Sequence, residues 1–248
     1  MTDFTETNRQ YFDQLATAYK DRFADAIKTV TEQTLSHRTW ISDRWTDTEA
    51  GRGQGIRMLE YACGPGMISM ALAPFLTNVV GVDVSENMVD EFNRNAAVMG
   101  LSDKVTGHKA DLLAESVSTD FSGPTFSNFD LLTVSMALHH FEHPDRALQQ
   151  LTKRLKSNGV CFIIDLVPEE GHHGHSHHHG HGEHEHPFGE AAKTVKTHGF
   201  SREDMQRLFE GVGLNVQFEY EIVSEPFVFH KDEQSFHKTV FMARAQLG

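Results

Sequence analysis

The sequence predicts an α/β protein built on a doubly wound, mostly parallel sheet, and two stretches carry this prediction. The first is a short apolar strand, Ile56 to Glu60, followed by a loop of small residues and then by helical spacing from Met67. The second is another apolar run, Val79 to Asp83, which also ends in an acid. A strand, a tight loop and a helix followed by a second strand form the first unit of such a sheet.

The loop after the first strand contains Gly64 and Gly66, which tolerate positive φ and let a ligand approach the backbone closely. Glu60 places a carboxylate at the end of the preceding strand. A dinucleotide-binding loop instead aims a helix N-terminus at a pyrophosphate. The carboxylate therefore favours a ligand that carries a cationic amine.

The rest of the chain continues the alternation of strands and helices. Helices are predicted over 8–45, 85–99, 145–156 and 201–211, and strands over 104–109, 129–136, 160–167, 214–222 and 236–245. The polar, Gly-rich stretch 46–55 is predicted to be a linker. We therefore expect a helical cover over residues 1–50 and a main domain over 51–248.

Composition excludes several classes of protein. With 248 residues and 39% hydrophobic residues, the chain is long and apolar enough for one globular domain with an extension. A net charge of −13 argues against a nucleic-acid partner. Two cysteines cannot form a disulfide framework. With no signal peptide and no membrane span in view, we expect an intracellular protein, cytoplasmic or nuclear or both.

These motifs resemble those of class I S-adenosylmethionine (SAM) methyltransferases, whose first motif reads roughly acid-x-Gly-x-Gly-x-Gly. Here Ala62 stands at the first glycine, a departure from the pattern. The segment Tyr11 to Tyr19 resembles the N-terminal helix of the ubiquinone- and menaquinone-biosynthesis type, a small-molecule group. The resemblance implies a Rossmann-like, seven-stranded sheet with strand 7 antiparallel and a helical N-terminal cover.

The resemblance also implies a set of cofactor-binding residues for SAM and for its product, S-adenosylhomocysteine (SAH). Glu60 would lie near the amino-acid moiety, Asp83 would bind the ribose hydroxyls, Asp111 would accept from the adenine amino group, and Met88 would pack on the adenine ring. Met88 can equally be a core methionine, and Asp111 a turn residue. The full set is Tyr19, Glu60, Ala62, Gly64, Gly66, Asp83, Val84, Met88, Asp111, Leu112 and Ser135.

Methyl transfer from a sulfonium is an in-line displacement in which alignment supplies much of the rate. If a base takes part, His139 and His140 are the best candidates, because they follow strand 4 and titrate near neutral pH. Alternatively, one of the pair packs or caps the next helix. The segment Ser135 to Leu138 lacks the Asn/Asp-Pro-Pro-Tyr/Phe loop of DNA-adenine and protein-glutamine methyltransferases, which disfavours those substrates.

Residues 171–187 form a low-complexity insertion that holds more than half of the chain's 17 histidines. So polar a tract cannot bury enough surface to fold by itself, so we expect a mobile loop. Three interpretations stay open: a neutral insertion, a site for zinc or another transition metal, or a lid or partner-docking segment. The candidate metal ligands are His175, His177, His179 and His181, although no fixed three-ligand spacing stands out.

The sequence thus predicts a SAM-dependent methyltransferase that acts on a small-molecule acceptor, or on a side chain of a protein. The alternative is a methyltransferase-like regulatory or binding protein whose His-rich loop binds metal or a protein partner. An NAD-dependent oxidoreductase is disfavoured, because the loop lacks G-x-G-x-x-G and carries Glu60 before it.

Overall fold

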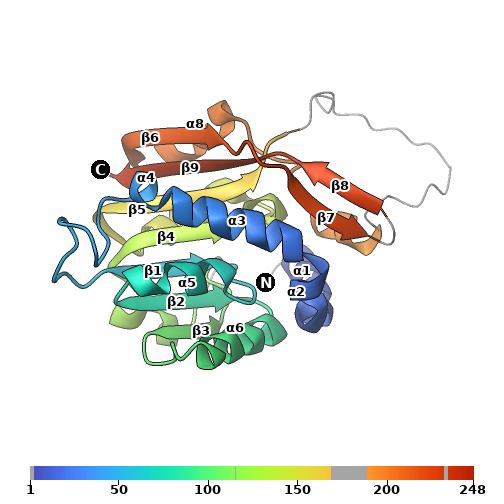
Figure 1. The fold of residues 1–248 in the computed structure, drawn as a ribbon, viewed down its shortest axis with the longest axis horizontal. Helices are drawn as coiled ribbons and strands as arrows, with labels where there is room; N and C mark the ends of the chain where they lie inside the picture. The colour runs from blue at the N-terminus through green and yellow to red at the C-terminus, as the bar shows by residue number, and fades with distance from the viewer. Residues whose placement is uncertain (1–2, 115, 169–188, 232–233) are drawn as a thin grey trace.

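The computed structural model describes residues 3–114, 116–168, 189–231 and 234–248 and contains the predicted sheet (Figure 1). Seven strands form it in the order β3-β2-β1-β4-β5-β9-β6. β1 pairs in parallel with β2 and β4, whereas β9 is antiparallel to both of its neighbours, β5 and β6. This arrangement confirms the predicted seven-stranded fold with one antiparallel strand.

The strands have the following bounds: β1 Arg57–Tyr61, β2 Asn78–Asp83, β3 Val105–Lys109, β4 Phe129–Ser135, β5 Leu155–Leu166, β6 Leu214–Ile222, β7 Phe227–Lys231, β8 Gln234–Lys238 and β9 Val240–Leu247. The α-helices are α1 Asp3–Leu15, α2 Tyr19–Arg22, α3 Ala24–Ser36, α4 Arg38–Ile41, α5 Met67–Leu72, α6 Glu86–Val98, α7 Pro144–Thr152 and α8 Arg202–Glu210. Short 3-10 helices are η1 Ala16–Ala18, η2 Ala73–Phe75, η3 Thr119–Phe121, η4 Pro124–Phe126, η5 Leu138–His140 and η6 Gly189–Thr194.

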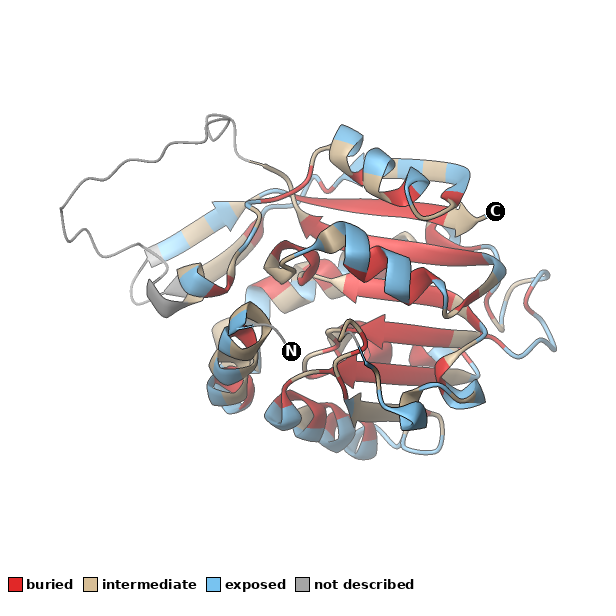
Figure 2. Ribbon diagram, turned by 180° about the vertical axis from the view of Figure 1, so that it is seen from behind, coloured by how far each residue is buried: buried red, intermediate tan, exposed pale blue. Residues whose placement is uncertain are grey.

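Two hydrophobic cores lie on opposite faces of the sheet, as the period-two alternation of a buried strand requires. In β1, Met58 belongs to the core beneath α3 and α5, whereas Leu59 belongs to the core beneath α7 and α8. Figure 2 shows the strands as the buried middle layer, with helices whose outer faces are exposed on both sides. Strands β2 and β4 and the second half of β5 are buried on both faces, so they read as nearly continuous apolar runs in the sequence.

Serine caps fix the starts of two helices where the sequence indicated them. The Ser85 side chain accepts a hydrogen bond from the Met88 amide at the start of α6. Ser201 and Asp204 form a reciprocal capping box at the start of α8. The cap on α6 matters for the site, because it fixes the helix that begins directly after Asp83.

The predicted N-terminal helix is several short helices, α1 to α4, with η1 between α1 and α2. The end of this segment packs into the main domain, because Ile41 and the following Trp45 lie in the same core as Ile56 and Met58. The Trp45 indole donates to the carbonyl oxygens of Arg38 and Ser42, which closes the end of α4. The polar stretch 46–55 has no helix or strand, in agreement with the predicted linker.

Two predicted boundaries are wrong. The helix expected over 145–156 ends at Thr152, and strand 5 begins at Leu155 instead of 160. Leu155 pairs with Phe129 and Val160 pairs with Leu131, so the polar residues 156–159 form a bulge within the strand. In the sequence these residues are typical of a turn.

The strand expected over 236–245 is also wrong, because it is divided between β8 and β9. β7 and β8 pair with each other in a separate two-stranded sheet that the sequence analysis did not identify. β8 pairs with β7, whereas β9, which follows it after one residue, pairs with β5 and β6. The alternation of apolar and polar residues does not reveal such a change of partner.

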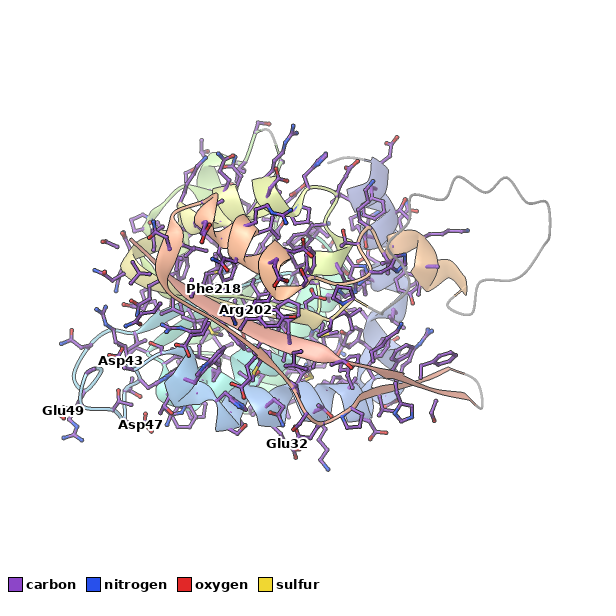
Figure 3. The ribbon with its side chains drawn as sticks, turned by 90° about the horizontal axis from the view of Figure 1, so that it is seen from above. Glu32, Asp43, Asp47, Glu49, Arg202 and Phe218 are labelled. Atoms are coloured by element: carbon purple, nitrogen blue, oxygen red, sulfur yellow. The ribbon has the colours of Figure 1, made fainter. Side chains whose placement is uncertain are left out.

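The acidic excess of the chain is carried in part by a surface loop. Figure 3 shows Asp43, Asp47 and Glu49 at the periphery, at the end of the molecule opposite the β7–β8 hairpin. Asp47 is paired with Arg38 through two hydrogen bonds of 2.8 and 2.9 Å. These carboxylates therefore lie away from the strand ends that form the site described below.

The loop after β1 takes a backbone conformation that glycine favours. Ala62, Gly64 and Gly66 have φ values of 54°, 49° and 81°. At Gly66 a Cβ atom would also come within 2.5 Å of the Phe92 ring. Of these three residues only Ala62 carries a side chain, and an alanine in the left-handed region costs about 1 kcal/mol or more.

We therefore expect Ala62→Gly to stabilise the protein by about 1 kcal/mol, because relief of the left-handed strain exceeds the added entropy of the unfolded chain. Chemical denaturation of the ligand-free protein measures this change. Ala97→Gly is the matched control: Ala97 is exposed within α6, where glycine should destabilise by about 1 kcal/mol. A loss of stability in both variants would contradict the assignment of strain to Ala62.

Candidate active site

Two neighbouring cavities open where the carboxyl ends of the parallel strands meet the N-terminal helices. The larger, about 910 Å³, is lined by residues after β1, β2, β3 and β4 together with α1. The smaller, about 480 Å³, is lined by α1 to α3, the loop after β1, the segment 191–199 and the β7–β8 hairpin. Ligands of open α/β sheets bind at this edge.

The larger cavity contains most of the residues predicted to bind a cofactor. Eight of the predicted residues line it: Tyr19, Ala62, Gly64, Asp83, Val84, Met88, Asp111 and Ser135. Three of the predicted residues do not. Glu60 lines the smaller cavity, Leu112 is buried in the core beneath α7 and α8, and Gly66 packs against Phe92.

Asp83 connects the loop after β1 with the start of α6 and, through Ser85, with α1. One carboxylate oxygen accepts from the Gly64 amide at 2.9 Å, and the other accepts from the Ser85 amide at 2.9 Å. The Ser85 hydroxyl in turn donates to Asp13 of α1 at 2.6 Å. Burial raises the pKa of Asp83 to about 6 despite its backbone hydrogen bonds.

Glu60 belongs to β1, and its side chain contacts α5, the helix that follows the loop. It is 2% exposed and accepts hydrogen bonds from the amide of Ser69, at 3.0 Å, and from its hydroxyl. Burial raises the pKa of Glu60 to about 7, against the opposing effect of the Ser69 hydrogen bonds. A cation near this carboxylate would favour its charged form.

Asp111 follows β3 and lines the larger cavity. It accepts from the Leu113 amide at 3.0 Å and from the Tyr61 hydroxyl at 3.5 Å. Met88, in the first turn of α6, is fully buried yet lines the same cavity. A carboxylate beside a flat apolar wall can bind a planar ring that carries an amino group.

Tyr19 connects the N-terminal helices to both cavities, because its side chain lines each of them. Burial, reinforced by the charges of Asp83 and Glu60, raises the pKa of Tyr19 to about 12, so the phenol stays protonated and can donate. Seven residues are common to the two cavities: Phe12, Tyr19, Ala62, Gly64, Ser135, Met136 and His140.

The two histidines after β4 lie at this boundary. His139 is buried, and its Nδ1 lies 2.7 Å from Oδ1 of Asp165 at the end of β5. His140 lies between both cavities, and its Nδ1 lies 2.7 Å from the Thr194 carbonyl oxygen. Neither caps the next helix, α7, whose N-terminus shows no side-chain cap.

The sequence analysis missed Asp165 and Thr194. Asp165 is an acid at the carboxyl end of a buried strand, the same signal that singled out Glu60 and Asp83, and it could have been found. Thr194 contributes a backbone carbonyl from a segment distant in sequence, which no side-chain pattern reveals.

The proposed metal ligands His175, His177, His179 and His181 lie outside the residues that the structure describes. Within the described part of the chain, no group of three or more His, Cys, Asp or Glu side chains could hold a metal ion. None of the helices described is both long and apolar enough to cross a membrane.

The chemistry of the larger cavity fits SAM. Its carboxylates, Asp83 and Asp111, can accept hydrogen bonds from hydroxyl and amino groups, and Gly64 leaves open space beside the backbone. The nearby Glu60 carboxylate suits a cationic amine. The larger cavity thus offers hydrogen-bond acceptors beside the apolar side chains of Met88 and Phe12. These groups suit a ligand with an adenine ring, hydroxyl groups and a positive charge.

Comparison with known proteins agrees with this geometry. A family model described as a methyltransferase domain matches residues 14–218. The chain is 32% identical over 164 residues to an uncharacterized methyltransferase of Schizosaccharomyces pombe, covering 65% of this chain and 54% of that protein. It is 27% identical over 122 residues to a ubiquinone biosynthesis O-methyltransferase of Bordetella avium, covering 49% and 47%. The matches thus span about half the length of these curated relatives.

Solved structures share the fold at low sequence identity. Magnesium protoporphyrin IX methyltransferase of Synechocystis, with bound SAM, gives a TM-score of 0.60 at 15% identity and covers 99% of this chain and 98% of its own. A Haloferax volcanii protein in complex with the Trm112 methyltransferase activator gives 0.63 at 14% identity and covers 96% of each chain.

The family match covers most of the chain, and the sheet order and cofactor cavity agree with it. The chain therefore belongs to the methyltransferase family, as a class I SAM-dependent methyltransferase.

Proposed function

We propose that this enzyme transfers the methyl group of SAM to a small, largely apolar acceptor. The observation that carries the proposal is that a cofactor-type cavity and a second, mostly apolar cavity share a wall at His140 and Met136. A methyl group passing from one ligand to the other needs such a boundary, where the two ligands touch.

The smaller cavity supports an apolar acceptor. Its walls include Phe12 and Phe23 from the N-terminal helices and Phe227 and Phe229 from β7, with aliphatic residues of α3 between them. The α3 helix is tied to the segment before β7 by a hydrogen bond of 2.7 Å from Gln33 to Glu225. A mostly apolar cavity of about 480 Å³ favours a small molecule over a peptide segment.

SAM supplies a methyl carbon made electrophilic by the sulfonium. In our proposal, Asp83 would hold the ribose hydroxyls, Asp111 would accept from the adenine edge and Met88 would pack on the ring. Glu60, from behind the loop, would stabilise the positive charge of the amino-acid end. The histidine pair faces the acceptor side, where it can contact the reacting group.

The ubiquinone biosynthesis O-methyltransferases among the relatives make a small-molecule acceptor the preferred class for this chain. A protein acceptor and a regulatory role of the His-rich tract have no supporting contact among the described residues. A metal at His175, His177, His179 and His181 stays a proposal, because these residues lie outside the part of the chain that the structure describes.

Titration of the purified protein with SAM and with SAH, with and without Zn²⁺ or a chelator, tests the proposal. We expect binding of both ligands at micromolar concentrations and no dependence on metal. Binding that requires metal would assign the His-rich tract a regulatory role, and absence of binding would refute the enzyme proposal.

Asp83→Ala should abolish detectable SAM binding while the fold survives. The variant loses the acceptor proposed for the ribose and the hydrogen bonds that hold Gly64 and Ser85, each of the order of 1.5–3 kcal/mol for a charged group. Calorimetry measures the affinity and thermal unfolding reports the fold. Asp90→Ala, an exposed position on α6, is the control and should bind normally. Unchanged affinity in Asp83→Ala would refute the assignment.

SAM affinity should rise with pH between about 5 and 7. In the free protein the pKa values of Glu60 and Asp83 are raised to about 7 and about 6, so both carboxyls hold protons at the acid end of this range. A cationic ligand favours their charged forms, so binding releases protons and weakens by up to about tenfold per pH unit per proton as pH falls.

Calorimetry of SAM binding across this range, in buffers of different ionisation enthalpy, measures the released protons. Glu60→Gln should reduce the pH dependence, because glutamine does not titrate. A pH-independent affinity in the unmodified protein would show that neither carboxyl responds to the ligand.

A further inference from the structure

A lysine lies in the mostly apolar wall of the smaller cavity. Among the described residues, Lys238 is the single Lys or Arg side chain that lines this cavity. It belongs to β8 and pairs directly with Phe227 of β7, so the two side chains lie on the same face of the hairpin. Phe227 lines the cavity as well. The face of the hairpin that borders the cavity therefore presents a cation beside an aromatic ring.

Hydrogen bonding to the main sheet fixes the position of Lys238. The carbonyl oxygen of the next residue, Thr239, accepts from the amide of Val167, which follows β5, at 2.9 Å. The residues on either side of Val167, Leu166 and Pro168, line the smaller cavity. Lys238 therefore lies at the base of the hairpin, beside the sheet, and not at its tip.

The two carboxylates in the same wall are held by other groups. Glu60 accepts hydrogen bonds from the amide and the hydroxyl of Ser69. Asp204 accepts from the amide and the hydroxyl of Ser201, at 3.0 and 2.7 Å, in the capping box of α8. Lys238 also interacts with the protein itself. Because an ammonium has three N–H donors, Lys238 can keep that interaction and bind an anionic ligand in addition.

Aromatic side chains border the smaller cavity on two sides, from the N-terminal segment and from the hairpin. They are Tyr11, Phe12, Tyr19 and Phe23 on the first side and Phe227 and Phe229 on the second. The faces and edges of aromatic rings pack favourably against another planar ring. The shape and the lining of this cavity thus favour a flat, aromatic ligand with one charged end.

We propose that Lys238 determines acceptor specificity, and that the acceptor is a planar aromatic molecule whose carboxylate binds the Lys238 ammonium. The inference rests on the proposed function and names its acceptor class. A carboxylate carries one negative charge, which one ammonium can compensate, whereas a phosphate monoester carries up to about two. From Lys238 the acceptor would extend through the cavity to the wall at Met136 and His140, which is shared with the cofactor cavity.

The charge of the whole chain gives Lys238 its importance for an acidic acceptor. With a net charge of −13, the protein repels anions over long range. A carboxylate that leaves water for a mostly apolar cavity also loses its hydration. A charge-assisted hydrogen bond from Lys238 compensates both effects. The neutral amide of the same acid has no charge to pair and gains little from the lysine.

Binding of 2-naphthoate and of its neutral amide, 2-naphthamide, tests the inference. Both probes are planar and nearly equal in size, and only the acid is charged. Each is titrated by calorimetry, near neutral pH, into the full-length protein saturated with SAH, which has no sulfonium charge to attract the acid. We expect the unmodified protein to bind naphthoate at least about tenfold more tightly than naphthamide, as a hydrogen bond between charged groups allows.

Three variants accompany the experiment. Lys238→Met removes the charge and should lower the affinity for naphthoate to that for naphthamide, whereas an unchanged affinity for naphthamide would show that the cavity is intact. Lys238→Arg keeps the charge and should retain most of the preference. Lys196→Met is the matched control: the Lys196 ammonium lies 5.4 Å from the centre of the Phe4 ring, and the residue lines neither cavity, so the preference should be unchanged.

Three results would each overturn the inference: equal binding of the two probes by the unmodified protein, binding of neither probe, or a preference for naphthoate that survives in Lys238→Met. Binding of SAH, measured in the same samples before a probe is added, tests the proposed function separately. If SAH binds and the preference is absent, the acceptor class alone is wrong. If SAH does not bind, the proposed function fails, and this inference fails with it.

Discussion

The carboxylate of Asp83 holds together the backbone segments that form the larger cavity. Its two oxygens fix the amides of Gly64 and Ser85, so the loop after β1 and the start of α6 share one anchor. Ser85 extends the connection to Asp13, which attaches α1 over the cavity. Burial of this carboxylate is costly without a bound ligand, because the charged form is poorly solvated there. Hydrogen bonds thus connect the loop, the start of α6 and α1 through Asp83 and Ser85.

The smaller cavity, which we propose for the acceptor, is lined in part by segments from the two ends of the chain. The N-terminal helices contribute Phe12 and Phe23, and the late β7 strand contributes Phe227 and Phe229. The histidine pair also lines this cavity, and His139 is held by Asp165 near the end of β5. A rigid sheet therefore carries the charged and hydrogen-bonding groups, while the segments added to its ends define the shape of the apolar cavity.

Much of the cofactor half could be predicted from sequence, because its signals are local. An apolar strand that ends in an acid, as at Glu60, Asp83 and Asp111, places that acid at the ligand edge of a parallel sheet whatever the remaining chain does. The same rule would have identified Asp165. The boundaries were less certain: the bulge at the start of β5 and the transfer of residues 234–238 from the main sheet to β7 depend on which strand is the partner. The alternation of apolar and polar residues along a strand does not show which other strand it pairs with.

The sequence by itself determined the fold class, the family and the acids at the ends of the strands, since each follows from short-range patterns with a fixed place in the sheet. Only the tertiary structure decided which histidine faces both cavities, that Glu60 lies behind the loop instead of in the larger cavity, and that Leu112 and Gly66 serve packing. It also brought the Thr194 carbonyl to His140 across more than fifty residues of chain. The physical reason is that hydrogen-bond partners and cavity walls arise from segments distant in sequence, whose meeting depends on packing of the whole chain.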